Sequence, residues 1–213
     1  MYPVPLREEC PRCPVPVART AGGRWACPDH GEIDVLRRPD DASYDEFVRA
    51  LGTAGDFPTY LPWPMSPGWM VSDFAVVGED PACGTATCSS GTSALDGPVD
   101  MFVVSEESGT GLGARCAGTV HLDPGAEVGH GPPPARVRVL SQSVPLWPVS
   151  TATSDVEVDR AVFAGEYAGR WLWVILRPAS AMLLLRDEWI LRDVSGLGPA
   201  LVELPFGGPR PSW

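Results

Sequence analysis

The sequence contains no lysine, because all 16 basic residues among its 213 positions are arginines. Acidic residues outnumber them at 27, which gives a formal net charge of −11 at pH 7. The charge is unevenly spread. Residues 1–38 carry six arginines against five acidic residues, whereas residues 39–213 carry ten against 22. A body this acidic repels phosphate backbones, so nucleic-acid binding would have to rest on the N-terminal segment alone.

Uninterrupted apolar stretches and export signals are also missing. The densest apolar segment, residues 160–194, is broken by Arg177 and Pro178, whereas a transmembrane helix needs about 20 apolar residues in a row. The first ten residues show no hydrophobic segment and no small-residue cleavage motif, so nothing marks the chain for secretion. We therefore expect a cytoplasmic protein without a membrane partner. In that reducing compartment, closely spaced cysteines bind metal more often than they form disulfides.

Glycine and proline are abundant, at 23 and 24 residues, and this disfavours long helices. Short apolar runs at residues 171–176, 181–185 and 189–191 are separated by turn residues. Runs of this length predict buried strands in a meander. Further strands are expected at residues 70–78, 100–105, 136–140 and 162–166.

One short helix is expected between these strands and the N-terminal segment. Ser43 and Glu46 have the spacing of a capping box, and Gly52 and Gly55 end the apolar pattern that follows. The sequence as a whole predicts a mainly β fold, α+β at most. Its largest part would be a predominantly antiparallel sheet, as a barrel or sandwich, with one or two short helices.

One strong motif lies near the N-terminus. Cys10 and Cys13 have two residues between them, and Cys27 and His30 form a second pair after 13 intervening residues. Each pair can form a tight turn, here called a knuckle, in which both side chains face one cation. A hairpin that joins the two knuckles places four ligands around that cation. Three thiolates with one imidazole favour zinc over calcium or magnesium. With every position filled by protein, this Zn2+ would be structural. The motif departs from the usual knuckle at Pro14, where a glycine would be expected, and incidental thiols without metal are the alternative.

The patterns divide the chain into four parts. They are a zinc-ribbon-like module at residues 1–38, a connector with the short helix at 39–59, a β-rich domain at 60–205 and a tail at 206–213. The tail is expected to fray unless Trp213 docks on the body.

A glycine-rich loop is the main candidate for a ligand site. Gly109, Gly111 and Gly113 alternate after a predicted strand, and Arg115 adds a positive charge. Backbone N–H groups in such a loop can face an anion. The loop matches neither the GxGxxG pattern nor the phosphate-binding P-loop, so a closely packed connection between strands is the competing interpretation.

Other candidates for catalysis are weaker. Glu106 and Glu107 are adjacent, so on a strand they face opposite sides and cannot act as a carboxylate pair on one substrate. No GxSxG nucleophile elbow is present. A second metal site from Cys83, Cys88, Cys116 and His121 is conceivable, but the spacing of these residues is irregular. Cys88 and Cys116 are better explained as small buried apolar groups.

Several segments together resemble an uncharacterised family of high-GC bacteria that is described only as a domain of unknown function. They are CPRC with WACPDHG, LPWPMSPGW, SEESGTGLGAR, PLW and DRAVFAGEYAGRWLW, in this order along most of the chain. The resemblance implies the N-terminal Cys/His motif and no established activity. The departures are Pro14 and the acidic segment at residues 151–159.

We therefore expect a non-catalytic zinc-ribbon protein that serves as a protein-interaction or regulatory module. Arg12, Arg24 and Trp25 are the expected exposed contacts to a protein partner. One alternative is an enzyme for a small phosphorylated or acyl substrate. It predicts a concave pocket in which a glutamate of the loop at residues 106–115 meets the loop's arginine. Another alternative is salt-dependent nucleic-acid binding by the ribbon.

Overall fold

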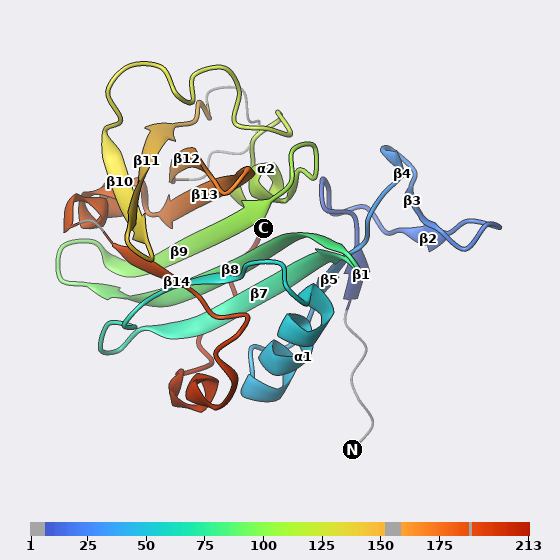
Figure 1. Ribbon diagram of the computed structural model, residues 1–213, viewed down its shortest axis with the longest axis horizontal. Coiled ribbons are helices and arrows are strands. Elements are labelled where there is room, and N and C mark those ends of the chain that lie inside the picture. Colours follow the sequence, from blue (N-terminus) through green and yellow to red (C-terminus); the bar gives the residue numbers. More distant parts are fainter. Residues whose placement is uncertain (1–6, 152–158, 188) are drawn as a thin grey trace.

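The computed structural model describes residues 7–151, 159–187 and 189–213, and in them the chain is mainly β (Figure 1). Strands form one large curled sheet and one small three-stranded sheet. Every strand pair is antiparallel except that of β10 with β14. The predicted fold class is confirmed, but among the described residues the large sheet stays open, with β1 at one edge and β6 at the other. None of the described helices is long and apolar enough to cross a membrane.

The large sheet has eleven strands, in the order β1 (Arg7–Glu9), β5 (Leu36–Arg38), β7 (Met70–Gly78), β8 (Ala82–Ser93), β9 (Gly97–Glu106), β13 (Arg170–Arg177), β12 (Ala161–Tyr167), β11 (Gln142–Pro148), β10 (Ala135–Val139), β14 (Ile190–Asp193) and β6 (Tyr60–Pro62). The small sheet contains β2 (Ala18–Arg19), β3 (Trp25–Cys27) and β4 (Gly31–Glu32). The helices are α1 (Tyr44–Ala54), α2 (Leu112–Ala117) and the 3-10 segments η1 (Ala179–Asp187) and η2 (Gly198–Glu203).

Both faces of the central strands are buried. On β9, Met101 and Val103 face a core that includes residues of β10, β11 and β14, whereas Phe102 and Val104 face a second core with α2. A third core lies between α1 and β7. Side chains alternate along a strand, so each face of β9 needs its own cover. The curl of the sheet brings β10, β11 and β14 over one face, and the helix α2 covers the other.

The local patterns place most elements well and misplace one. Residues 70–78, predicted as a strand, form β7, and α1 begins after Ser43, whose hydroxyl accepts a hydrogen bond from the Glu46 N–H. The strand predicted at residues 181–185 is wrong, because this run lies in η1. Its buried residues, Ala181 and Leu185, are four positions apart and Met182 is exposed, which is a helical spacing that a short apolar run does not reveal.

A buried carboxylate on β7 ties β5 and the C-terminal segment together. Asp73 on β7 is 2% exposed and accepts hydrogen bonds from Arg38 Nε at 2.9 Å, Arg210 Nε at 3.1 Å and Trp213 Nε1 at 2.7 Å. The Trp213 ring lies 4.3 Å from the Arg38 guanidinium carbon and 5.2 Å from that of Arg115. The segment after residue 206 is therefore docked, with Trp213 as its anchor.

We expect Asp73→Asn to lower the free energy of unfolding by about 3 kcal/mol, because it leaves two largely buried guanidinium groups without their anion. Glu79→Gln is the matched control, since it removes the partner of the neighbouring Arg37 at a site where the glutamate is 67% exposed. Glu79→Gln should lower the free energy of unfolding by less than about 1 kcal/mol. Urea unfolding measures both, and equal losses would contradict this account.

Candidate metal centre

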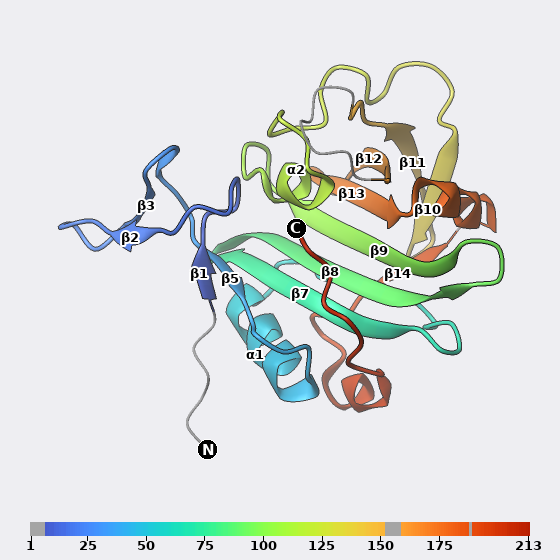
Figure 2. The same ribbon diagram turned by 180° about the vertical axis from the view of Figure 1, so that it is seen from behind.

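The N-terminal ribbon projects from the large sheet. Figures 1 and 2 show β2, β3 and β4 as an arm beyond β1 and β5. A turn closes its hairpin, in which the Thr20 N–H donates to the Arg24 carbonyl at 2.7 Å and the Gly23 N–H donates to the Thr20 carbonyl at 2.9 Å. This turn brings β3 back, so that the second knuckle of the motif lies beside the first.

The four residues predicted as ligands meet at one point. Each offers one donor atom, and these atoms all lie within 4.8 Å of one another. His30 Nδ1 lies 3.6 Å from the Cys10 sulfur and 3.5 Å from the sulfurs of Cys13 and Cys27. The sulfurs of Cys13 and Cys27 are 3.6 Å apart. These four nearly equal separations match edges of a tetrahedron, so the cluster can hold one metal ion at its centre.

The two knuckles differ in the residue that follows them. Gly31 follows His30 with a φ of 68°, the left-handed conformation that glycine adopts without strain. Pro14 follows Cys13, and the first knuckle nevertheless closes, with the Arg12 N–H donating to the Cys10 sulfur at 3.4 Å. The proline removes one backbone N–H from the surroundings of Cys13 and leaves the ligand positions intact.

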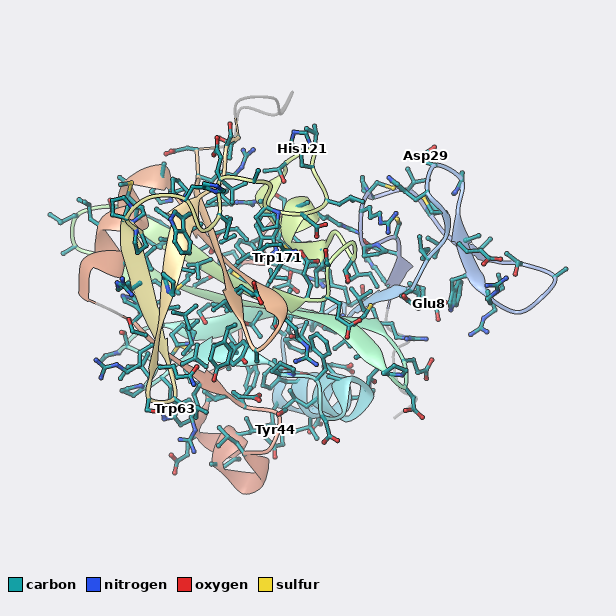
Figure 3. All side chains as sticks on the ribbon, turned by 45° about the horizontal axis from the view of Figure 1, so that its top comes forward. Glu8, Asp29, Tyr44, Trp63, His121 and Trp171 are labelled. Atoms are coloured by element: carbon teal, nitrogen blue, oxygen red, sulfur yellow. The ribbon has the colours of Figure 1, made fainter. Side chains whose placement is uncertain are left out.

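The thiols of the cluster sit in different electrostatic settings. Burial raises the pKa of Cys10 to about 11. Burial also acts to raise the pKa of Cys27, but hydrogen bonds from His30 and from the backbone of Asp29 outweigh it and lower that pKa to about 7. Figure 3 shows Asp29, which lies between Cys27 and His30 in the sequence, on a loop of the ribbon that is well separated from Trp171 in the body.

One arginine of the body holds the first knuckle in place. The Arg115 side chain, on α2, is 4% exposed and pairs with the carboxylate of Glu9. It also donates to the backbone carbonyls of Cys10 and, at 3.1 Å, Cys13. A guanidinium group suits this position, because its fixed fork of donors can serve a carboxylate and two carbonyls at once.

An arginine of the ribbon reaches back into the glycine-rich loop. The guanidinium of Arg12 donates to the carbonyls of Gly109 at 2.7 Å and Thr110 at 3.4 Å. Gly111 has a φ of 85°, and a Cβ there would lie 2.9 Å from the Arg12 Cγ. The loop therefore needs glycine both for its conformation and for the close approach of the ribbon. We call these two reciprocal contacts, by Arg115 and Arg12, the arginine clamp.

The two glutamates before this loop point to opposite sides, as the sequence predicted. Glu106 is fully buried, and its Oε2 accepts a hydrogen bond from the Leu112 N–H at 2.7 Å, which caps the first turn of α2. Burial raises the pKa of Glu106 to about 7. Glu107 is exposed. Gly113 allows α2 to approach the sheet, since a Cβ there would lie 2.2 Å from the Trp173 Nε1.

Among the described residues, the cavities beside the glycine-rich loop do not bring Glu106 or Glu107 together with Arg115 as the enzyme alternative predicted. Glu107 lines two cavities, of about 710 and about 180 Å³, and Arg115 lines neither of them. Glu106 is enclosed behind α2, and Arg115 is occupied by the ribbon. The glycine-rich loop, expected as a ligand loop, offers the carbonyls of Gly109 and Thr110 to the Arg12 side chain.

The expected partner contacts fall in different surroundings. Arg12 is half-buried in the arginine clamp, so the expectation that it is exposed was wrong. Arg24 is 73% exposed and pairs with Glu32 at 2.5 Å. Trp25 is half-buried, with the Arg19 guanidinium 4.6 Å from its ring centre.

No second metal site forms among the described residues. The only group of three or more His, Cys, Asp or Glu side chains found close enough there to hold an ion is the N-terminal one. Cys88 and Cys116 are 1% and 0% exposed and belong to the core beneath α2, as the sequence predicted for small apolar groups. Cys83 lies on β8 and is half-buried.

The raised pKa of Glu106 predicts a pH dependence of stability. Between pH 4.5 and about 7 the folded protein keeps a proton that the unfolded chain has lost, so the free energy of unfolding falls as the pH rises. The contribution of this one group is on the order of 3 kcal/mol. We expect Glu106→Gln to remove that part of the slope in urea titrations, whereas Glu107→Gln keeps it. A variant at position 106 with the wild-type slope would refute this assignment.

The arginine clamp predicts a defined effect of Arg115→Lys. Lysine keeps the charge but offers a single ammonium group, which cannot reproduce the fork of contacts to three acceptors. Hydrogen exchange of ribbon amides at residues 10–32 should become about tenfold faster, which corresponds to about 1.4 kcal/mol of docking free energy. Arg24→Lys, at an exposed pair outside the clamp, should leave exchange unchanged. Equal exchange in both variants would show that the clamp does not hold the ribbon.

Neither the curated proteins nor the solved structures gave a match. One family matched over residues 6–213, which is nearly the whole chain and includes the Cys/His cluster, the glycine-rich loop and Trp213. The chain therefore belongs to the family of unknown function DUF6758.

Proposed function

We propose that the cluster binds one structural zinc ion and that the ribbon so formed is a non-catalytic protein-interaction module. The observation that carries the proposal is the spacing of the donor atoms. Tetrahedral zinc with bonds of about 2.3 Å to sulfur and about 2.05 Å to nitrogen separates two sulfurs by about 3.8 Å, and a sulfur from a nitrogen by about 3.6 Å. The cluster has separations of 3.6 Å and 3.5–3.6 Å.

A structural role follows from how the site is built. Three thiolates and one imidazole fill all four positions, so no position is left for a reacting water. The ribbon also has almost no core of its own. Between residues 10 and 34 the buried residues are Cys10, Pro11 and Cys27, and two of these are ligands. Metal coordination would replace the missing apolar core, as in other small zinc modules.

An interaction role is supported by what remains exposed. The ribbon stands away from the sheet, and its strands β2 and β4 are edges with exposed residues. Unpaired strand edges are ready sites for a partner segment. Arg24 and the Arg19–Trp25 pair lie outside the arginine clamp, so they are available to a protein partner while Arg12 fixes the ribbon to the body.

Metal content tests the zinc site directly. Protein purified under reducing conditions should contain about one zinc per chain, and Cys10→Ser should lose it, because one of four ligands is removed. Cys83→Ser is the matched control, since that thiol lies outside the cluster and its loss should leave the zinc content unchanged. Wild-type protein without bound metal would refute the proposal.

Metal removal should act locally. A chelator should raise hydrogen exchange throughout residues 10–32, because this segment has no other core, while the amides of β7, β8 and β9 stay protected by the sheet. Uniform loss of protection across the chain would contradict a metal that supports the ribbon alone.

The interaction role is tested by comparison of variants in binding assays. A protein partner should bind the zinc-loaded chain, lose affinity for the chelated chain and for Trp25→Ala, and show little dependence on salt. If the chain instead binds nucleic acid with a steep salt dependence, and Arg24→Ala abolishes that binding, the ribbon is a nucleic-acid-binding module.

A further inference from the structure

The three thiols of the metal centre differ in how easily a reagent in solution reaches them. Cys10 is 0% exposed and Cys27 is 2% exposed, because both face the body or the hairpin. Cys13 is half-buried, so part of it remains open to solution. Reaction with a small oxidant depends on both access and thiolate character, so access singles out Cys13.

The backbone around the thiols adds a second difference. The Arg12 N–H donates to the Cys10 sulfur at 3.4 Å. In the described part of the chain, no backbone N–H donates to the sulfur of Cys13. Pro14 follows Cys13 and has no N–H to offer. Hydrogen bonds to a metal-bound thiolate withdraw electron density, so the Cys13 sulfur is more nucleophilic than the Cys10 sulfur, and it is more accessible than the Cys27 sulfur.

The nearest partner for an oxidised Cys13 is already in place. The Cys27 sulfur lies 3.6 Å from the Cys13 sulfur, held there by the shape of the metal site. The Cys13 carbonyl, in turn, is one of the acceptors of Arg115. A change at Cys13 therefore affects both the metal centre and the arginine clamp.

We propose that Cys13 is a peroxide-reactive thiolate whose oxidation to a disulfide with Cys27 opens the metal centre and loosens the ribbon from the body. The inference rests on the proposed zinc site. Hydroperoxides are the class of oxidant. The Cys13 thiolate attacks one peroxide oxygen, the O–O bond breaks, and the sulfur becomes a sulfenic acid as hydroxide leaves.

The Cys27 thiolate then attacks the Cys13 sulfur, the S–O bond breaks, and a second hydroxide leaves as the S–S bond forms. Two thiolates lose two electrons in total, and one hydrogen peroxide with two protons becomes two waters. The site then retains one thiol and one imidazole, which is too few ligands to hold zinc tightly. Movement of the Cys13 backbone also takes a carbonyl away from Arg115, so the docked ribbon loses part of the arginine clamp.

The test uses the full chain, loaded with one zinc per molecule and treated with hydrogen peroxide. Zinc release is followed with a chromogenic chelator, and disulfides are mapped by peptide mass spectrometry. We expect release in step with the loss of two thiols and a peptide pair that joins Cys13 to Cys27. Hydrogen exchange of the ribbon should rise at the same time.

Three variants give the inference its controls. Pro14→Gly restores an N–H beside Cys13 and should slow release about fivefold, the effect of one hydrogen bond. Cys13→His keeps four ligands and should keep its zinc under peroxide. Cys83→Ser removes the half-buried thiol outside the centre and should release zinc at the wild-type rate.

The outcomes separate this inference from the proposed zinc site. Protein that never holds zinc would refute the zinc site. Zinc-loaded wild-type protein that keeps its metal under peroxide, or a Cys13→His variant that releases it at the wild-type rate, would overturn the inference about Cys13 while the zinc site stands.

Discussion

The guanidinium group of Arg115 is the contact on which the arrangement of this chain depends. It lies where α2, the first metal knuckle and Trp213 meet, and it has a carboxylate, two carbonyls and an aromatic ring around it. A buried guanidinium without these partners would be costly, so the ribbon and the body each complete the other's hydrogen bonding. Glu106 adds to this constraint, because it caps the helix that carries Arg115.

Electrostatic contacts also join segments that lie far apart in the sequence. Asp73 on β7 binds Arg38 on β5 and two residues near the C-terminus, Arg210 and Trp213. The Trp213 ring then lies beside both Arg38 and Arg115. The ribbon, the sheet and the last segment share one connected set of contacts. The family match over residues 6–213 includes all three parts.

Much of this architecture was predictable from local patterns, and the failures have physical reasons. The ligand spacing and the cap at Ser43 are short-range features, so the sequence revealed them. Strand β8 was missed because its Thr, Ser, Gly and Cys residues carry little apolar signal and become buried only when distant strands and helices pack against them. The role of the glycine-rich loop was also hidden, because Arg12 and Gly109 are 97 positions apart and only folding brings them together.

The fit of Gly111 against Arg12 restricts how this protein can be rearranged. Here the receiving loop is shaped for one particular side chain, and β1 and β5, on either side of the ribbon, are strands of the large sheet. A chimera that exchanged the ribbon alone would leave an unfilled loop and an uncompensated arginine, so the two parts must be inherited together.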